Sequence, residues 1–311
     1  MNEGRCVAFS NKNAQMLRGI LHEPDSDNAL GVCILLLSPG IKGRVGPHRL
    51  YLKIAERLVP IGFHVLRFDY HGLGDSEGEL PERALADMYN TVHGGRYVED
   101  TIAAMDWMEG TFGIRRFVGS GLCGGSISAL LTASIDLRIE CLLGIGIPTA
   151  LDGGPENWGR SLTGGQLKEL RTGYLRKLMD PRAWTRLLSG KTNYSVLWRS
   201  LRGGSRARSS SPGRTPSAPA ADNVNPRFAP AFRAVLDSAR PMLLIFSAND
   251  RMHHEFEEKF EGRNPDLAAR RGTLYQTIVI PNANHVLSDR SSVTALLDHA
   301  ELWLAVRYGH M

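Results

Sequence analysis

Cysteine is scarce in this 311-residue chain, and long apolar runs are absent. No pair of cysteines has C-x-x-C spacing, which argues against a zinc site, and such isolated thiols fit a reducing compartment. No apolar run approaches the roughly 18 residues that span a bilayer, and residues 1–10 lack the apolar centre of a signal peptide. We therefore expect a cytoplasmic protein with no transmembrane segment, metal or cofactor. The four cysteines are Cys6, Cys33, Cys123 and Cys141.

Acidic residues are almost missing between Arg160 and Arg214, where thirteen Lys or Arg face only Glu169 and Asp180. This segment carries +11, so the rest of the chain carries −6 of the total of +5. A basic region on a mildly acidic body predicts an acidic partner, such as a carrier protein or coenzyme A, and we expect no nucleic-acid partner. The alternative is a solvated helical face followed by a disordered tail.

Strand-like and helix-like segments alternate along the rest of the chain. Residues 7–9 and 17–22 flank a turn-like Ser-Asn-Lys-Asn and predict an antiparallel hairpin. Apolar runs at 31–37, 63–68, 116–119, 141–147, 242–246 and 277–280 are typical of buried strands. Helical spacing of apolar residues covers 50–59, 97–108, 127–134 and 293–306. Strands separated by helices predict an α/β fold, with a mostly parallel twisted sheet flanked by helices.

The alternation breaks between the sixth and seventh strands. We predict a core formed by residues 1–150 and 228–311, and a helical cap or lid at 151–227. Within the cap, residues 166–188 favour helix with a break at Pro181. Residues 203–226 are rich in Ser, Arg, Pro, Gly and Ala, which predicts disorder because little apolar surface is available for burial.

The strongest chemical signal is the stretch Gly119-Ser-Gly-Leu-Cys-Gly-Gly125, between a predicted strand and a predicted helix. A nucleophile on a sharp strand-to-helix turn requires small neighbours two positions away, and Gly121 and Gly125 meet this requirement. Cys123 is the predicted nucleophile. The start of the following helix favours an anion there, and therefore a thiolate.

Two further residues complete a predicted triad in the order nucleophile, acid, histidine. Asp250 follows the strand that begins at 242, and His285 follows the last predicted strand. We expect His285 to deprotonate the thiol and then protonate the leaving group, and Asp250 to orient the imidazole. Asp152, after the sixth strand, is the alternative acid.

Backbone amides should stabilise the oxyanion of the reaction. We predict the N–H groups of Gly124 and Ile41 as donors, with Gly40 permitting close approach. His48 and Arg49 follow this loop and could bind a carboxylate or phosphate of the substrate, with solvation of a helix start as the alternative. Two other groups are expected to be non-catalytic: the glycine-rich loop 69–78, interpreted as structural, and His253 with His254, interpreted as surface residues.

The sequence resembles a known family at four places. These are residues 46–49 (GPHR), 65–78 (VLRFDYHGLGDSEG), 121–123 (GLC) and 174–181 (YLRKLMDP). They are similar to the α/β-hydrolases associated with bacterial exosortase systems, over most of the chain except about 203–226. The resemblance implies the α/β-hydrolase fold with a cap between strands 6 and 7. Members often carry an acidic residue after the cysteine, where this chain has Gly124.

A cysteine nucleophile defines the reactions to be expected. Acylated Cys123 is a thioester, which remains activated towards water, amines, alcohols and thiols. The leading hypothesis is a hydrolase of an ester or thioester, a thioesterase among others, acting through an acyl-cysteine intermediate. The first alternative is an acyltransferase using the same triad. The second is a non-catalytic binding protein that retains the fold.

Overall fold

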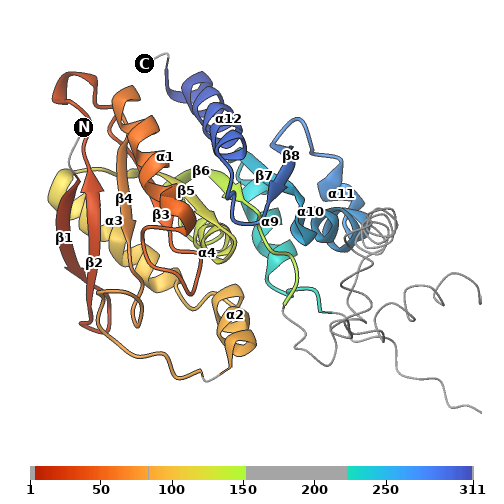
Figure 1. The fold of residues 1–311 in the computed structure, drawn as a ribbon, viewed down its shortest axis with the longest axis horizontal. Coiled ribbons are helices and arrows are strands. Elements are labelled where there is room, and N and C mark those ends of the chain that lie inside the picture. The colour runs from red at the N-terminus through yellow and green to blue at the C-terminus, as the bar shows by residue number, and fades with distance from the viewer. Residues whose placement is uncertain (1–3, 83, 152–222, 310–311) are drawn as a thin grey trace, which may run out of the picture. The chain divides into compact units, whose positions relative to one another are not determined.

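The computed structural model describes residues 4–82, 84–151 and 223–309. Apart from Asn223 they belong to one compact unit, formed by Met1–Asp152 and Val224–Met311 (Figure 1). The predicted helix at 166–188, most of the predicted cap and the basic segment lie outside the described residues. Within them, no helix combines the length and apolar character needed to cross a bilayer.

An eight-stranded sheet forms the centre of this unit, in the order β1-β2-β4-β3-β5-β6-β7-β8. The hairpin β1–β2 is antiparallel, β2 pairs antiparallel with β4, and all other neighbours are parallel. The mostly parallel sheet and its hairpin confirm the predicted fold class. The strands are β1 Arg5–Ser10, β2 Met16–His22, β3 Val32–Leu37, β4 His64–Phe68, β5 Arg116–Leu122, β6 Ile139–Ile145, β7 Met242–Asn249 and β8 Tyr275–Asn284.

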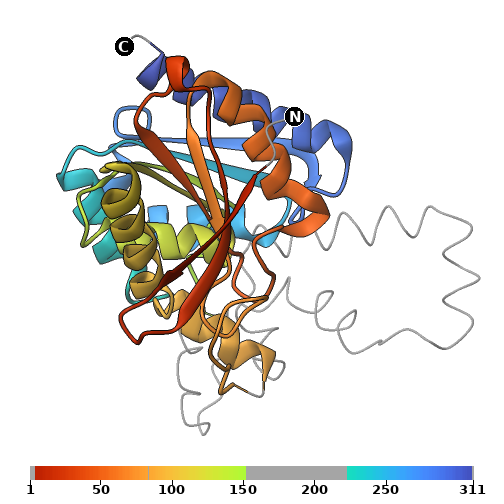
Figure 2. The ribbon, with the colours of Figure 1, turned by 90° about the vertical axis from the view of Figure 1, so that its left-hand side faces the viewer.

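Helices cover both faces of the sheet (Figures 1 and 2). All six residues of β3 are buried, as expected for a strand in the middle of such a sheet. On one face α1 packs against α12, where Arg57 forms ion pairs with Asp298 and Glu301. On the other face α4 packs against α3 and α9. The predicted helices are α1 Leu50–Leu58, α3 Val98–Phe112, α4 Gly124–Ala133 and α12 Arg290–Tyr308.

Several helices were not predicted from the sequence. The most important is α2, Leu85–His93, which has only Met88, Val92 and His93 buried. Leu85, Met88, Tyr89 and Val92 have helical spacing, but the segment is only nine residues long and no helix was predicted there. The others are α9 Phe228–Asp237, α10 Arg251–Glu255 and α11 Pro265–Ala268.

The end of the predicted disordered segment is ordered, which corrects that prediction for residues 223–226. Val224 bridges to Ala150, and the amide of Asn225 donates to the carbonyl of Thr149 at 2.9 Å. Asn225 is buried. The chain is therefore fixed to the carboxyl end of β6 at the point where the insertion ends.

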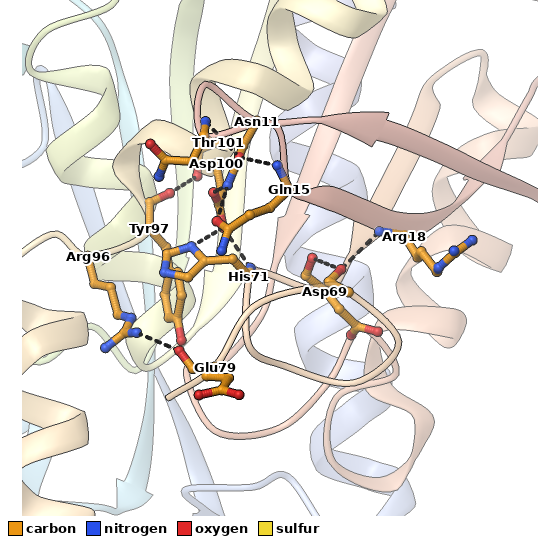
Figure 3. A network of polar contacts seen from close by, with 12 residues as sticks. Asn11, Gln15, Arg18, Asp69, His71, Glu79, Arg96, Tyr97, Asp100 and Thr101 are labelled. Carbon is orange, nitrogen blue, oxygen red and sulfur yellow. Dashed lines mark hydrogen bonds and ion pairs between the residues drawn. The ribbon is translucent and has the colours of Figure 1, made fainter. Parts of the chain in front are cut away.

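The glycine-rich loop after β4 is anchored by a buried carboxylate from α3 (Figure 3). Asp100 accepts hydrogen bonds from the amide of His71 at 2.8 Å and from the side chain of Asn11 at 2.9 Å. The ring of His71 lies 2.8 Å from the same carboxylate. Nearer the start of the loop, Arg44 pairs with Asp69. These contacts support the structural interpretation of residues 69–78.

Candidate active site

The nucleophile position lies directly between β5 and α4. Cys123 has φ 53° and ψ −114°, a strained conformation for a residue with a side chain, and its amide donates to the carbonyl of Ile145 at 2.8 Å. A Cβ on Gly121 would lie 2.7 Å from the carbonyl oxygen of Leu37. A Cβ on Gly125 would lie 2.9 Å from the carbonyl carbon of the same residue. Both predicted glycine requirements therefore arise from close approach of backbone to backbone.

Two buried hydroxyls hold this turn in place. The hydroxyl of Ser126 accepts from the amide of Ile145 at 2.8 Å and donates to the carbonyl of Gly121 at 2.5 Å. The hydroxyl of Tyr51 accepts from the amide of Leu122 at 2.8 Å and donates to the carbonyl of Leu37 at 2.6 Å. Neither residue was predicted from the sequence, because Tyr51 and Ser126 join the turn to segments that are distant in sequence.

The predicted acid and histidine are joined. His285 directly follows β8 and Asp250 directly follows β7, and the carboxylate of Asp250 lies 2.6 Å from Nδ1 of His285. Asp250 is 8% exposed and also caps α10 by accepting from the amide of Met252. Gly146, at φ 54°, leaves room for the pair, since a Cβ there would lie 3.7 Å from each side chain. The alternative acid, Asp152, lies outside the described residues.

The ionisation of the thiol links it to this pair. Burial opposes formation of the Cys123 thiolate, but the imidazoles of His285 and His93 more than offset it and lower the pKa to about 6. Burial also opposes charge on His285, yet Asp250 and Cys123 raise the pKa of the imidazole to about 10. Near neutral pH the two groups therefore form a thiolate–imidazolium pair.

The other buried thiols show the opposite behaviour. Burial raises the pKa of Cys33, and burial raises the pKa of Cys141 to about 12. No neighbouring imidazole in the described part of the chain lowers the pKa of either thiol, so the effect of burial is not offset. Cys123 is thus distinguished from two other buried cysteines by its surroundings, as expected for a reactive thiol.

The elements that carry the predicted oxyanion donors touch each other. Gly124 is the first residue of α4, and a Cβ on it would lie 2.6 Å from the carbonyl oxygen of Pro39. Gly40 follows at φ 111°, a conformation that favours glycine, and Ile41 is partly buried against the core. The amides of Gly124 and Ile41 as oxyanion donors remain a prediction.

The predicted substrate residues His48 and Arg49 lie at the start of α1. Both are exposed and both have positive φ, 50° and 58°. Among the described residues, neither side chain forms a hydrogen bond or ion pair with the triad. Their role in substrate binding stays a prediction.

Three further histidines differ from the sequence-based expectation, one beside the thiol and two outside the site. His93, at the end of α2, adds a second imidazole beside the thiol and was missed because α2 was not predicted. His253 and His254 are partly buried, and with Glu257 they place three potential metal ligand atoms within 4.8 Å of one another. Nε2 of His253 lies 3.2 Å from a carboxylate oxygen of Glu257, four residues further along the chain.

Comparison with known proteins identifies the family and the fold of the chain. Residues 35–296 match the model of the Alpha/beta hydrolase family, and no curated protein matches the sequence. Three similar solved structures share only 12–16% identity and so indicate the fold alone. The alpha/beta hydrolase GrgF from Penicillium sp. sh18 has 15% identity and a TM-score of 0.58, covering 99% of both chains. The Pyrococcus furiosus esterase PF2001 has 16% identity and a TM-score of 0.57, covering 99% of this chain and 92% of that one. XC6422 from Xanthomonas campestris, a serine hydrolase without lid, has 12% identity and a TM-score of 0.55, covering 100% and 98%.

Proposed function

Since the chain belongs to the alpha/beta hydrolase family, we propose that it is a hydrolase that cleaves an ester or thioester through Cys123, His285 and Asp250. The observation that carries the proposal is the strained strand-to-helix turn at Cys123 together with an imidazole, His285, that is bonded to the buried carboxylate of Asp250. The lowered pKa of the Cys123 thiol agrees with this arrangement. The esterase among the similar structures shares the fold. Unpaired thiols at all four cysteines fit a reducing, cytoplasmic setting.

In the first half of the reaction, the Cys123 thiolate attacks the carbonyl carbon and a carbon–sulfur bond forms. The negative charge moves to the carbonyl oxygen, facing the amides of Gly124 and Ile41. When the tetrahedral intermediate collapses, the bond to the leaving group breaks. The imidazolium of His285 gives its proton to the departing alcohol or thiol, and an acyl-cysteine thioester remains.

In the second half, neutral His285 takes a proton from water as the water oxygen attacks the thioester. Collapse breaks the carbon–sulfur bond, releases the acid and restores the thiolate beside the imidazolium. Asp250 stabilises the charged imidazole and fixes its orientation in both halves, through the 2.6 Å contact with Nδ1.

The same intermediate allows a second function. An amine, alcohol or thiol in place of water would make the protein an acyltransferase, with His285 as the base for the acceptor. The +11 segment supports an acyl donor on an acidic carrier protein or coenzyme A. Binding of such a donor should weaken as salt rises, and salt-independent binding would contradict this part of the proposal.

The test is incubation with a panel of acyl esters and acyl thioesters, followed by intact mass spectrometry and peptide mapping. We expect an acyl adduct on Cys123 and its loss in Cys123→Ala with the fold retained. Cys6→Ala is the matched control, because Cys6 is an exposed thiol remote from the triad. Free acid as product supports the hydrolase, and a modified acceptor supports the acyltransferase. An unchanged turnover in Cys123→Ala would refute the site, and no adduct with any donor would favour a non-catalytic binding protein.

A further inference from the structure

His93 is a buried imidazole without a hydrogen bond at either ring nitrogen among the described residues. The residue is 3% exposed, and both Nδ1 and Nε2 are shielded from solvent. A buried polar group without a partner costs free energy, about 1–3 kcal/mol, so such a group indicates either strain or a function. The triad chemistry described above does not use it.

Helix α2 brings this imidazole to the nucleophile. The neighbouring residue Val92 packs against the turn, since a Cβ on Gly124 would lie 2.9 Å from its Cγ1. A Cβ on Gly40 would lie 3.3 Å from the same atom. The end of α2 therefore touches both the start of α4 and the predicted oxyanion loop. The charge distribution agrees, because His93 is one of the two imidazoles that lower the pKa of the Cys123 thiol against its burial.

The position of His93 is fixed from its backbone. Its carbonyl oxygen accepts a hydrogen bond from the side chain of Asn225 at 2.8 Å. Asn225 is 2% exposed, and its own amide donates to the carbonyl of Thr149 at 2.9 Å. Asn225 thus connects the end of β6 to the end of α2. A side chain held in this way is expected to act on a defined atom.

Among the described side chains that face Cys123, the two that can stabilise a negative charge on its sulfur are imidazoles. From α1, Tyr51 faces the turn, but burial raises its pKa and both its hydrogen bonds go to backbone groups. From the loop after β8, His285 faces the thiol with Asp250 behind it. His93 comes from α2. The metal-ligand group found among the described residues is the one at His253, so a metal role for His93 has no support there.

We propose that His93, whose ring nitrogens have no other partner among the described residues, donates a hydrogen bond to the Cys123 sulfur once the thiol is ionised, and shares with His285 the stabilisation of the thiolate. The part that His93 plays in turnover rests on the proposed function. His285 must give up its proton to the leaving group, and it then accepts one from water. His93 exchanges no proton in either half, so it keeps a donor beside the sulfur when the thiolate leaves the acyl group. This makes the thiolate a better leaving group in deacylation.

The test uses alkylation of the thiol by iodoacetamide, without any acyl donor, from about pH 4 to about pH 9. Wild type should show a midpoint near pH 6, following the lowered pKa of Cys123. His93→Phe removes the donor and keeps an aromatic ring, and we expect its midpoint to rise by about one pH unit, a tenfold smaller thiolate fraction at low pH. His93→Gln retains an N–H and should recover part of the shift. His253→Asn, a histidine outside the site, should leave the midpoint unchanged.

Two outcomes would overturn the assignment. One is a folded His93→Phe variant whose alkylation midpoint equals that of wild type. The other is an equal rise of the alkylation midpoint in the Phe and Gln variants, which would indicate a structural role. A second measurement leaves His93 intact, in case the variants do not fold. The imidazole ¹⁵N shifts of His93 should differ between wild type and Cys123→Ala near pH 7.5, and identical shifts would also refute the contact. Because no acyl donor is used, failure here is distinct from failure of the hydrolase proposal.

Discussion

The geometry of the nucleophile turn can be tested with two glycine-to-alanine substitutions of opposite expected sign. In Gly125→Ala the new Cβ would overlap the carbonyl oxygen of Leu37 and lie 3.1 Å from that of Ser38. All the atoms it meets are backbone, so no side chain can move aside, and overpacking of this kind costs about 1–3 kcal/mol or more. In Gly110→Ala, on the exposed side of α3, nothing lies within 4 Å. Alanine there should stabilise by about 1 kcal/mol through helix propensity.

The assay is thermal unfolding of both variants under the same conditions. At about 2 °C per kcal/mol for a chain of this size, Gly110→Ala should raise Tm by about 2 °C and Gly125→Ala should lower it by about 2–6 °C. Activity and alkylation of Cys123 should fall only in Gly125→Ala, since the thiol depends on this turn. If Gly125→Ala is as stable and as reactive as wild type, the close approach of α4 to Leu37 is wrong, and with it the placement of the thiol.

Three further substitutions test separate contacts. Asp250→Asn should slow turnover by about 10²-fold or more, measured as steady-state product formation, because a neutral amide no longer stabilises the imidazolium of His285; a full rate would exclude Asp250 as the acid. Ser126→Ala leaves two buried backbone groups unpaired and should cost about 1–3 kcal/mol in urea unfolding, whereas a wild-type midpoint would contradict the bonds at the turn. Asp100→Ala should destabilise by about 3 kcal/mol by releasing the loop at His71, seen as faster amide exchange in that loop; unchanged exchange would show that the anchor is unimportant.

The sequence predicted the triad because strand ends are visible in a parallel sheet. Apolar runs marked the strands before Cys123, Asp250 and His285, and the structure extends each strand to the residue directly before these three. Helix α4 begins at Gly124, three residues earlier than predicted, because two glycines favour a loop by propensity while the turn requires them. At this turn, backbone packing outweighs the low helix propensity of glycine.

The sequence did not predict that a second imidazole, that of His93, lies beside the thiol. Leu85, Met88, Tyr89 and Val92 give α2 helical spacing, but the place of His93 beside the thiol depends on packing of α2 against α4, which no local pattern shows. Its anchor, Asn225, lies in a stretch whose composition predicts disorder, yet a single buried amide fixes it to the core. Composition describes a segment on average and does not register one such contact.

The contact between the carboxylate of Asp250 and the imidazole of His285 depends on sheet register. Parallel pairing of β7 with β8 runs from Met242 with Tyr275 through Ser247 with Ile280, and an irregularity then brings Asn249 opposite Asn284. Beyond that irregularity the next residues are Asp250 and His285, so the bulge sets the pair side by side across 35 positions of sequence. Without the added residues in β8, His285 would lie further from Asp250 along the strand direction. The chemistry at Cys123 therefore depends on strand pairing at the far edge of the sheet as much as on the turn that holds the sulfur.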